Sequence, residues 1–392
     1  MKSKKVYGQL VALGYVLMEC LKLLAAKVVS FFLKEKDVWL IADRGENASD
    51  NGFFFFIYLK RNHPEINARF VISKDSPDYS KVVDYEDDLV QYKSFDHYTM
   101  FCKATCLVSS FFYHAGYSPC PHQTAILNQY TRLFKRKKQV CLKHGVTKDF
   151  FPEFLYERTR VDMMCCVSRQ ELEYIRDVYG YPPEVLRLTG FCRFDSLSNT
   201  PSRTVLVMPT WRKWLENEEF PSNGFFQEWA SLLNDQELDY ILSQTGLSLV
   251  FYPHYLIQPF IGYFKSVVNN PRIFVADQSC DLQDMINQSL VLITDYSSVF
   301  FDFAYLHKPV VFYQFDKALF NDGHHSEGYF KYEDGFGPVT DIKGELLSEL
   351  RRLIGNDFKM DELYRKRVDV FFHIKDSHNC DRVFDAIISL DR

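Results

Sequence analysis

Residues 290–302 read Leu-Val-Leu-Ile-Thr-Asp-Tyr-Ser-Ser-Val-Phe-Phe-Asp, and this stretch decides the fold class. Residues 290–293 form a short apolar run that suits a buried parallel strand. Residues 294–298 carry side chains that end a strand and cap a helix, and the chain then has helical potential. A strand that turns through two serines into a helix offers N–H groups, hydroxyls and a positive dipole end, which suit a phosphate. The same pattern also fits an ordinary capped helix in an α/β domain.

Similar apolar runs recur along the whole chain, separated by segments of helix length. The predicted strands are 38–42, 70–73, 106–110, 139–142, 163–168, 186–190, 204–209, 247–252, 273–275, 291–294 and 309–313. Helical patterns cover residues 51–60, 344–354 and much of 361–390. Strands that alternate with helices predict βα units and parallel sheets.

A polar, turn-rich segment at residues 199–203 divides this pattern into two halves. The 392 residues are enough for two domains, each with its own core. We therefore expect an α/β protein with a leader at 1–36 and two Rossmann-like, doubly wound domains, at 37–200 and 201–392. Ligands of such sheets bind beyond the carboxyl ends of the strands, so the expected site is a cleft between the domains.

The leader is predicted to be a helix that associates with a membrane. Residues 6–33 are largely apolar, but Glu19, Lys22 and Lys27 interrupt them, whereas a transmembrane span needs about 20 apolar residues. No small-residue cleavage site follows, which argues against a cleaved signal peptide. The flanking lysines are Lys2, Lys4, Lys5, Lys34 and Lys36. This pattern favours a basic amphipathic helix on an anionic surface; a true span and a helix packed on the core are the alternatives.

The composition excludes several classes of protein. A net charge of −5 argues against a general nucleic-acid binder. The ten cysteines show no pairs with zinc-site spacing, which indicates buried free thiols in a reducing compartment. The carboxylates do not cluster as in a metal cage, so we expect chemistry without a metal. Aromatic residues make up 16% of the chain, which predicts an aromatic core or contact with a membrane.

Polar side chains follow several of the predicted strands. His144 can act as a general base near neutral pH, and Gly145 allows a close approach of the backbone to a ligand. Arg193, Arg212 and His254 follow three other strands and can bind phosphate oxygens. A histidine in this position is also often structural.

A basic run precedes the strand that leads to His144. Its members are Arg132, Lys135, Arg136, Lys137 and Lys138. Such a run is either a solvated face or a contact with anionic lipid or a polyanionic chain. Its place next to His144 favours the second interpretation, a membrane or acceptor contact.

The order of these clusters resembles that of the CDP-glycerol:glycerophosphotransferase family, the teichoic acid and capsule polymerases and primases of bacteria. The matching motifs are Lys143-His-Gly-Val-Thr-Lys148, Gly190-Phe-Cys-Arg193 with Asp195, Pro209-Thr-Trp-Arg212, Pro253-His254, Ile293 to Asp302, Lys308-Pro-Val-Val-Phe-Tyr313, Gly328-Tyr-Phe and Asn379-Cys-Asp-Arg382. The likeness covers about residues 37–390.

The resemblance implies a fold of the glycosyltransferase B type and a CDP-polyol such as CDP-glycerol as donor substrate, without a cofactor. It also implies a lipid-linked glycan or polyol-phosphate acceptor at the cytoplasmic face of the bacterial cell membrane. By position it makes His144 the base, while His254 holds the pyrophosphate and stabilises the CMP leaving group. The donor-binding residues that it implies are Gly145, Val146, Thr147, Arg193, Trp211, Arg212, Tyr252, Pro253, Ser297, Ser298 and Asp302.

Three functions fit these observations. The first is transfer of glycerol phosphate or a related polyol phosphate with release of CMP, and the serine turn followed by Asp302 favours it. The second is a nucleotide-sugar-dependent glycosyltransferase of the same fold. The third is a membrane-bound scaffold without catalysis, against which the retained histidines and arginines argue. The sequence leaves open the choice between glycerol and ribitol, the acceptor and the polymer length.

Overall fold

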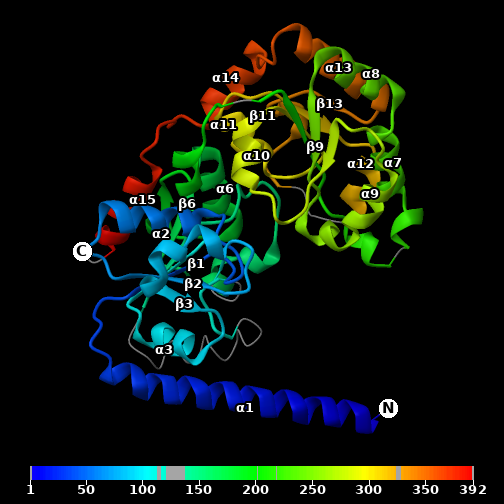
Figure 1. The fold of residues 1–392 in the computed structure, drawn as a ribbon. Helices are drawn as coiled ribbons and strands as arrows, with labels where there is room; N and C mark the ends of the chain where they lie inside the picture. Colours follow the sequence, from blue (N-terminus) through cyan, green and yellow to red (C-terminus); the bar gives the residue numbers. More distant parts are fainter. Residues whose placement is uncertain are drawn as a thin grey trace.

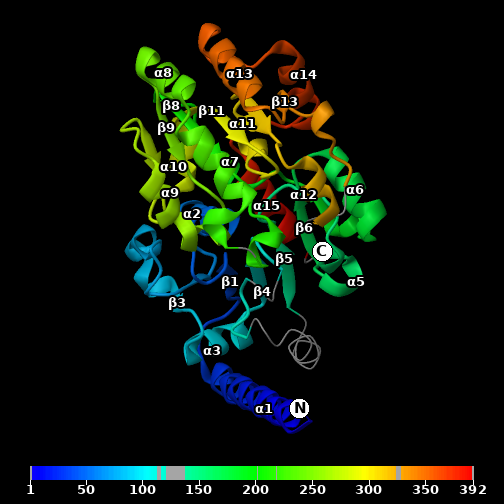
Figure 2. The ribbon, with the colours of Figure 1, turned by 90° about the vertical axis from the view of Figure 1, so that its right-hand side faces the viewer.

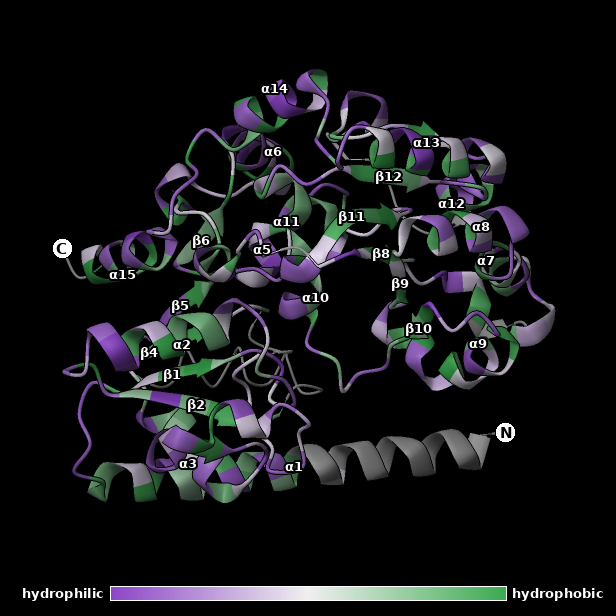
Figure 3. Ribbon diagram, turned by 45° about the horizontal axis from the view of Figure 1, so that its top comes forward, coloured by the Kyte–Doolittle hydropathy of each residue, from purple (hydrophilic) through white to green (hydrophobic). Residues whose placement is uncertain are grey.

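The protein forms two α/β domains, each built on its own parallel sheet (Figure 1). The computed structural model describes residues 2–112, 116–120, 137–200, 202–217, 219–323 and 328–390. The central strands of both sheets are largely hydrophobic (Figure 3), because parallel sheets are covered on both faces. The predicted class is therefore confirmed.

The N-terminal domain contains a seven-stranded sheet in the order β3-β2-β1-β4-β5-β6-β7, and neighbouring strands are parallel. Its strands are β1 (Trp39–Ala42), β2 (Ala68–Ile72), β3 (Leu89–Gln91), β4 (Cys106–Ser109), β5 (Lys138–Cys141), β6 (Met163–Cys166) and β7 (Leu186–Leu188). Its helices are α1 (Lys2–Phe32), α2 (Asn51–Asn62), α3 (Phe95–Lys103), α5 (Tyr156–Thr159) and α6 (Arg169–Tyr179).

The C-terminal domain contains a six-stranded parallel sheet in the order β10-β9-β8-β11-β12-β13. Its strands are β8 (Thr204–Met208), β9 (Ser248–Phe251), β10 (Ile273–Val275), β11 (Ser289–Thr294), β12 (Val310–Tyr313) and β13 (Val339–Thr340). The helices that follow β8 along the chain are α7 (Gly224–Leu233), α8 (Gln236–Thr245), α9 (Ile261–Val267), α10 (Leu282–Gln288), α11 (Phe300–Tyr305), α12 (Lys317–Gly323), α13 (Lys343–Gly355), α14 (Glu362–Phe371) and α15 (Asn379–Ser389). The sequence prediction missed the two edge strands β3 and β13, which have only three and two residues.

The last helix, α15, returns to the N-terminal domain and lies beside α2 (Figure 1). Val383 and Ile387 of α15 lie in the hydrophobic cluster of the N-terminal sheet. The carboxylate of Asp195 accepts hydrogen bonds from the backbone N–H groups of Asn379 (2.9 Å) and Cys380 (2.8 Å) at the start of the helix. The chain thus crosses between the domains twice, and α15, which follows the C-terminal domain in sequence, packs on the N-terminal sheet.

An aromatic cluster joins the two domains. Phe191 and Phe194, which follow β7, share a buried cluster with Phe300 and Phe301 of α11. The rings of Phe194 and Tyr305 stack with their centroids 4.3 Å apart. Such pairs contribute about 0.5–1.5 kcal/mol beyond the burial of their area. Some of the abundant aromatic residues therefore pack the two domains together, while others fill the core of each domain.

Helix α1 lies along α3 at the edge of the N-terminal domain (Figures 1 and 2). Glu19 is only 3% exposed; its carboxylate accepts a hydrogen bond from the hydroxyl of Tyr98 and pairs with Lys22 at 2.8 Å. The charge that interrupts the apolar leader thus fixes the helix to its domain. Among the described residues, no helix combines the length and the hydropathy that a membrane span requires.

Replacing the carboxylate of Asp195 should weaken the attachment of α15. Asp195→Ala leaves the N–H groups at the start of α15 without their acceptor, which lowers the free energy of unfolding by about 1–3 kcal/mol. Urea unfolding followed by far-UV circular dichroism measures this loss. Asp385→Ala, an exposed change on the same helix, is the control, and an equal loss in both variants would contradict the assignment.

Candidate active site

A buried ion pair shapes the loop that carries His144, directly after β5. Lys143 has a positive φ of 64°, and its ammonium group pairs with the fully buried carboxylate of Glu171. Glu171 also accepts hydrogen bonds from the backbone N–H groups of Thr147 (2.6 Å) and Val167 (2.9 Å). These contacts hold the loop against the domain, while the side chain of His144 stays 62% exposed.

His144 pairs with Asp50, which caps the N-terminus of α2. Burial raises the pKa of Asp50, but the neighbouring His144 and Arg193 outweigh it and hold this pKa below its ordinary value. An ionised carboxylate can only accept hydrogen bonds, so Nδ1 of His144 carries the proton. Nε2 is then the basic nitrogen of the ring. The sequence analysis did not assign Asp50 to the site, although an aspartate that caps a helix after a strand is a recognisable signal.

Asp43, at the end of β1, orders the turn that holds Asp50. Its carboxylate accepts hydrogen bonds from the backbone N–H groups of Asp50 and Gly52, both at 3.0 Å, and from the hydroxyl of Ser110 at 2.6 Å. Burial, and then the nearby charge of Asp50, raise the pKa of Asp43 to about 7. These three hydrogen bonds fix a turn that carries one carboxylate of the site.

Arg193 connects the Asp50–His144 pair to the other domain. Its NH1 donates to Asp50 Oδ1 at 3.2 Å and to the carbonyl of His144 at 2.7 Å. Its Nε and NH2 donate to the carboxylate of Asp302 in α11 at 2.7 and 3.0 Å. Arg193 and Asp302, both predicted to bind the donor, therefore form an ion pair with each other, and Arg193 positions the histidine.

The serine turn after β11 faces the loop of His144, as the strand-end argument predicts. A Cβ atom on Gly145 would lie 2.9 Å from the Oγ of Ser298. The absence of a side chain at this glycine allows the close approach of the two domains. Ser297 and Ser298 are partly exposed, so their hydroxyls lie at the junction of the domains beside the histidine.

Arg212 lies inside the C-terminal domain and has no exposed side-chain surface. Its guanidinium donates to Asp316 (2.7 and 3.1 Å) and to the carbonyl of Thr210 (2.6 Å), and it pairs with Asp295 at 2.8 Å. The donors of Arg212 thus already have protein acceptors beneath the serine turn, and its contact with phosphate stays a prediction.

His254 lies beyond the end of β9 and acts as a neutral donor. Its Nδ1 accepts a hydrogen bond from the backbone N–H of Leu256 at 3.3 Å, so the proton is on Nε2. Burial, and then the charges of His144 and Arg44, lower the pKa of His254 to about 4. At neutral pH this side chain can therefore donate a hydrogen bond without carrying a charge.

The other residues with a predicted role in donor binding are less exposed than His144. Val146, Thr147 and Pro253 are buried, whereas Trp211 and Tyr252 are partly exposed. The structure gives no ligand contact for any of them, and their roles stay predictions.

An aromatic stack next to His144 contains a residue that the sequence analysis missed. The ring of Phe111, after β4, stacks on the ring of His144 with centroids 4.9 Å apart. The guanidinium of Arg44, after β1, lies 4.3 Å from the centroid of Phe111 and 4.7 Å from that of Tyr255. Arg44 follows a predicted strand as Arg193 does, so the same rule, a polar side chain after a strand end, would also have identified Arg44.

The basic run is described only in part. Lys137 is 8% exposed, and its ammonium donates to the carbonyls of Cys102 (3.0 Å) and Ala104. Burial lowers the pKa of Lys137 to about 8. The ammonium group of Lys137 thus already has protein acceptors, and Lys138 is partly buried at the start of β5. The membrane or acceptor contact of the basic run stays a prediction. The members outside the described residues are Arg132, Lys135 and Arg136.

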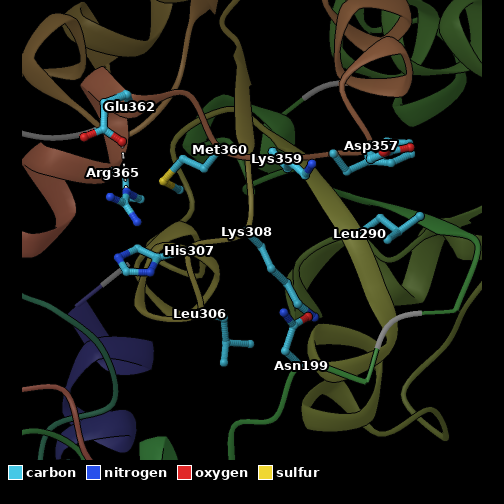
Figure 4. A pocket seen from close by; sticks show the side chains of 11 residues that line it. Asn199, Leu290, Leu306, His307, Lys308, Asp357, Lys359, Met360, Glu362 and Arg365 are labelled. Carbon is cyan, nitrogen blue, oxygen red and sulfur yellow. Dashed lines mark hydrogen bonds and ion pairs between the residues drawn. The ribbon is translucent and has the colours of Figure 1, made fainter.

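A cavity of about 730 Å³ lies at the other end of the C-terminal sheet (Figure 4). Leu290 near the start of β11, Lys308 before β12 and Met360 before α14 line it. Ligands of parallel sheets bind beyond the carboxyl ends of the strands. This cavity adjoins the amino ends and is therefore separate from the histidine site.

Comparison with known proteins identifies the family of the chain. Residues 23–389 match the family described as CDP-Glycerol:Poly(glycerophosphate) glycerophosphotransferase. The chain belongs to this family. Among the described residues, no group of three or more His, Cys, Asp and Glu side chains could hold a metal ion, and the expectation of chemistry without a metal stays a prediction.

Two relatives show how far the similarity reaches. The chain is 31% identical over 373 residues to the minor teichoic acid biosynthesis protein GgaB of Bacillus subtilis, covering 91% of this chain and 40% of GgaB. It is 26% identical to a teichoic acid poly(glycerol phosphate) polymerase of Staphylococcus epidermidis, covering 87% of this chain and 48% of the relative. The chain thus spans less than half the length of either protein.

Solved structures share the fold. A variant of the wall teichoic acid polymerase TagF superposes with a TM-score of 0.67 at 17% identity, covering 93% of each chain. The S. aureus MnaA–UDP structure superposes with a TM-score of 0.56 at 14% identity, covering 91% of this chain and 98% of the other. At these identities the likeness supports the two-domain α/β fold alone.

Removing the charge of Asp50 should impair His144 as a base. Asp50→Asn can no longer stabilise the protonated imidazole, so we expect kcat to fall roughly 100-fold, the lower end of what acid–base groups contribute. Release of nucleotide from CDP-glycerol, measured at saturating donor, reports this change. Asp84→Asn, an exposed substitution in the same domain, should have no effect, and unchanged turnover in Asp50→Asn would rule out the role of the pair.

Proposed function

We propose that the protein transfers glycerol phosphate, or a related polyol phosphate, from CDP-glycerol to an acceptor hydroxyl in teichoic acid or capsule synthesis, with release of CMP. The observation that carries this proposal is the Asp50–His144 pair facing the turn of Ser297 and Ser298 in a chain of this family. Two relatives are named as teichoic acid proteins, and TagF variants of the same fold were soaked with CDPG, which supports this class of donor.

In this proposal His144 activates the acceptor. Its Nε2 takes the proton of the acceptor hydroxyl, whose oxygen forms a bond to the phosphorus that carries glycerol. The bond from that phosphorus to the bridging oxygen of the pyrophosphate breaks, and CMP leaves with the electron pair. Asp50 stabilises the imidazolium that forms, because its carboxylate lies against the other ring nitrogen.

The leaving group is stabilised from the C-terminal domain. The Nε2–H of His254 and the hydroxyls of Ser297 and Ser298 are donors that can reach the pyrophosphate oxygens. Neutral donors fixed in place gain most when negative charge develops on CMP. Arg193 and Asp302 contribute by holding the two domains at the separation that this transfer needs.

We also propose that α1 places the enzyme on the cytoplasmic face of the membrane, where lipid-linked acceptors are found. One face of the helix is apolar and exposed: Leu17, Met18, Leu21, Leu24, Val28, Val29, Phe31 and Phe32. Phe31 is 83% exposed and Phe32 is 77% exposed. Lys34 and Lys36 follow this face in the sequence, which suits a helix in the interface of an anionic leaflet.

The second candidate is a nucleotide-sugar-dependent transferase. The MnaA structure, which shares this fold, contains UDP. Release of nucleotide from CDP-glycerol, CDP-ribitol and UDP-glucose, assayed in parallel with a membrane lipid extract, separates the two. Release of CMP from one CDP-polyol alone supports polyol-phosphate transfer and identifies the donor. Turnover of UDP-glucose alone would replace the proposal with sugar transfer.

Loss of the His144 imidazole should abolish most catalysis while leaving the donor bound. We expect His144→Ala to lower kcat roughly 100-fold or more, with a smaller change in the Kd of CDP-glycerol. Single-turnover assays and equilibrium binding measure the two quantities separately. His373→Ala, an exposed control, should behave as the parent, and a collapse of donor binding with intact turnover of bound donor would refute the role of His144.

Placing charges on the apolar face of α1 should release the protein from membranes. Leu21→Glu combined with Val28→Glu puts two carboxylates where apolar side chains meet the lipid, so flotation with vesicles containing anionic lipid should be lost. Gln236→Glu with Gln244→Glu on α8 changes the net charge equally and should still float. Equal flotation of both variants would contradict contact through this face.

A further inference from the structure

Arg44 differs from the other two arginines of the site because no carboxylate in the described part of the chain pairs with it. Arg193 and Arg212 are each bound to two carboxylates. The guanidinium of Arg44 instead lies 4.3 Å from the ring of Phe111 and 4.7 Å from the ring of Tyr255. The first ring belongs to the N-terminal domain and the second to the C-terminal domain, so the cation is held where the domains meet.

This placement suits the recognition of an anion. Aromatic rings interact with the face of a planar guanidinium. The N–H groups at its edge then remain available, in a fixed plane, for two oxygens of a phosphate. Arg44 is partly exposed, so a substrate can reach it. A cation that pairs with no carboxylate among the described residues can pair with an anionic ligand.

The neighbours of Arg44 indicate which substrate it meets. Phe111, which contacts Arg44, also stacks on His144 at 4.9 Å, and His144 is the base for the acceptor hydroxyl. The groups assigned to the donor, Ser297, Ser298 and His254, belong to the other domain. Arg44 thus contacts the same aromatic ring as His144, the group that meets the acceptor hydroxyl in the proposed function. The second ring that it contacts belongs to Tyr255, which follows His254 in the sequence.

We propose that Arg44 binds the terminal phosphodiester of the acceptor, one polyol unit away from the hydroxyl that His144 deprotonates. The enzyme then favours acceptors that already end in a polyol phosphate over neutral acceptors, and it acts in chain extension. This inference rests on the proposed function and adds the acceptor subsite to it.

Two soluble acceptors that differ in one charge test the subsite. Glycerophosphoglycerol presents a phosphodiester next to a terminal glycerol, and diglycerol presents the same hydroxyls on a neutral ether. The parent enzyme should use the first acceptor with the higher kcat/KM in CMP release from CDP-glycerol. Arg44→Gln should lower kcat/KM for glycerophosphoglycerol by roughly 10- to 100-fold, the range of a charge-assisted hydrogen bond pair, and leave diglycerol unchanged.

Matched variants separate recognition from folding. Arg176→Gln, an exposed arginine of α6, should alter neither acceptor. Tyr255→Phe keeps the ring beside the guanidinium and should retain the preference, whereas Tyr255→Leu should reduce it. Arg44→Lys keeps the charge without the planar fork and should recover part of the loss.

Three results would overturn the proposal. A rise in the KM of CDP-glycerol with an unchanged acceptor preference would assign Arg44 to the donor. Equal losses with both acceptors would make Arg44 a contact that only joins the domains. A parent enzyme without preference for the phosphodiester would exclude the subsite directly.

Binding measured without turnover keeps this inference separate from the proposed function. Calorimetric titration with glycerophosphoglycerol should show weaker binding to Arg44→Gln than to the parent, whether or not CDP-glycerol is turned over. If the parent binds this probe through Arg44 but no CDP-polyol reacts, the proposed reaction is wrong and the anion subsite stands. If CMP is released but the parent and Arg44→Gln bind this probe equally, the proposed reaction stands and the anion subsite at Arg44 is wrong.

Discussion

The bridge of Arg193 between Asp50 and Asp302 is the interaction on which the site depends. It is the contact through which a residue of the first domain is held both to the catalytic loop and to the second domain. Its charges are largely buried, and removing one partner of such a pair costs about 3–5 kcal/mol because the other is left uncompensated. One guanidinium faces two carboxylates, so these three side chains together carry a net negative charge next to His144.

The polar bridge needs a rigid surrounding, and the aromatic cluster behind it provides one. Phe191 and Phe194 flank the segment of Arg193, and Phe301 and Phe303 flank Asp302 in sequence. The residues that form the ion pair and the residues that pack the domains together therefore alternate in the same two short segments. A shift of either segment would disturb both kinds of contact, so the spacing between His144 and the serine turn is set by packing as well as by charge.

Much of the fold was predictable because buried parallel strands leave a simple signal in the sequence. The apolar runs located all strands of the two sheets except β3 and β13. β13 has only two residues, and β3 has two apolar residues directly after the acidic residues 86–88. The strand-end rule also found His144, Arg193 and His254, because a parallel sheet collects its loops at one edge. It could not foresee which charges pair. Arg212 and Arg193 both follow predicted strands. Arg212, however, pairs with Asp295 and Asp316 within its own domain.

The pairings that the sequence conceals decide what the site can do. Asp50 and His144 are 94 positions apart, and Arg193 and Asp302 are 109 positions apart, so neither contact follows from local spacing. Once these pairs are formed, the positive charges that remain for a phosphate are few, because two of the three arginines are neutralised and His254 is held neutral by burial. Under the proposed function, a site of this kind binds a pyrophosphate mainly through neutral donors. Such donors favour the developing charge of the leaving CMP without holding the product as tightly as a cluster of cations would, which suits an enzyme that must release CMP after every transfer.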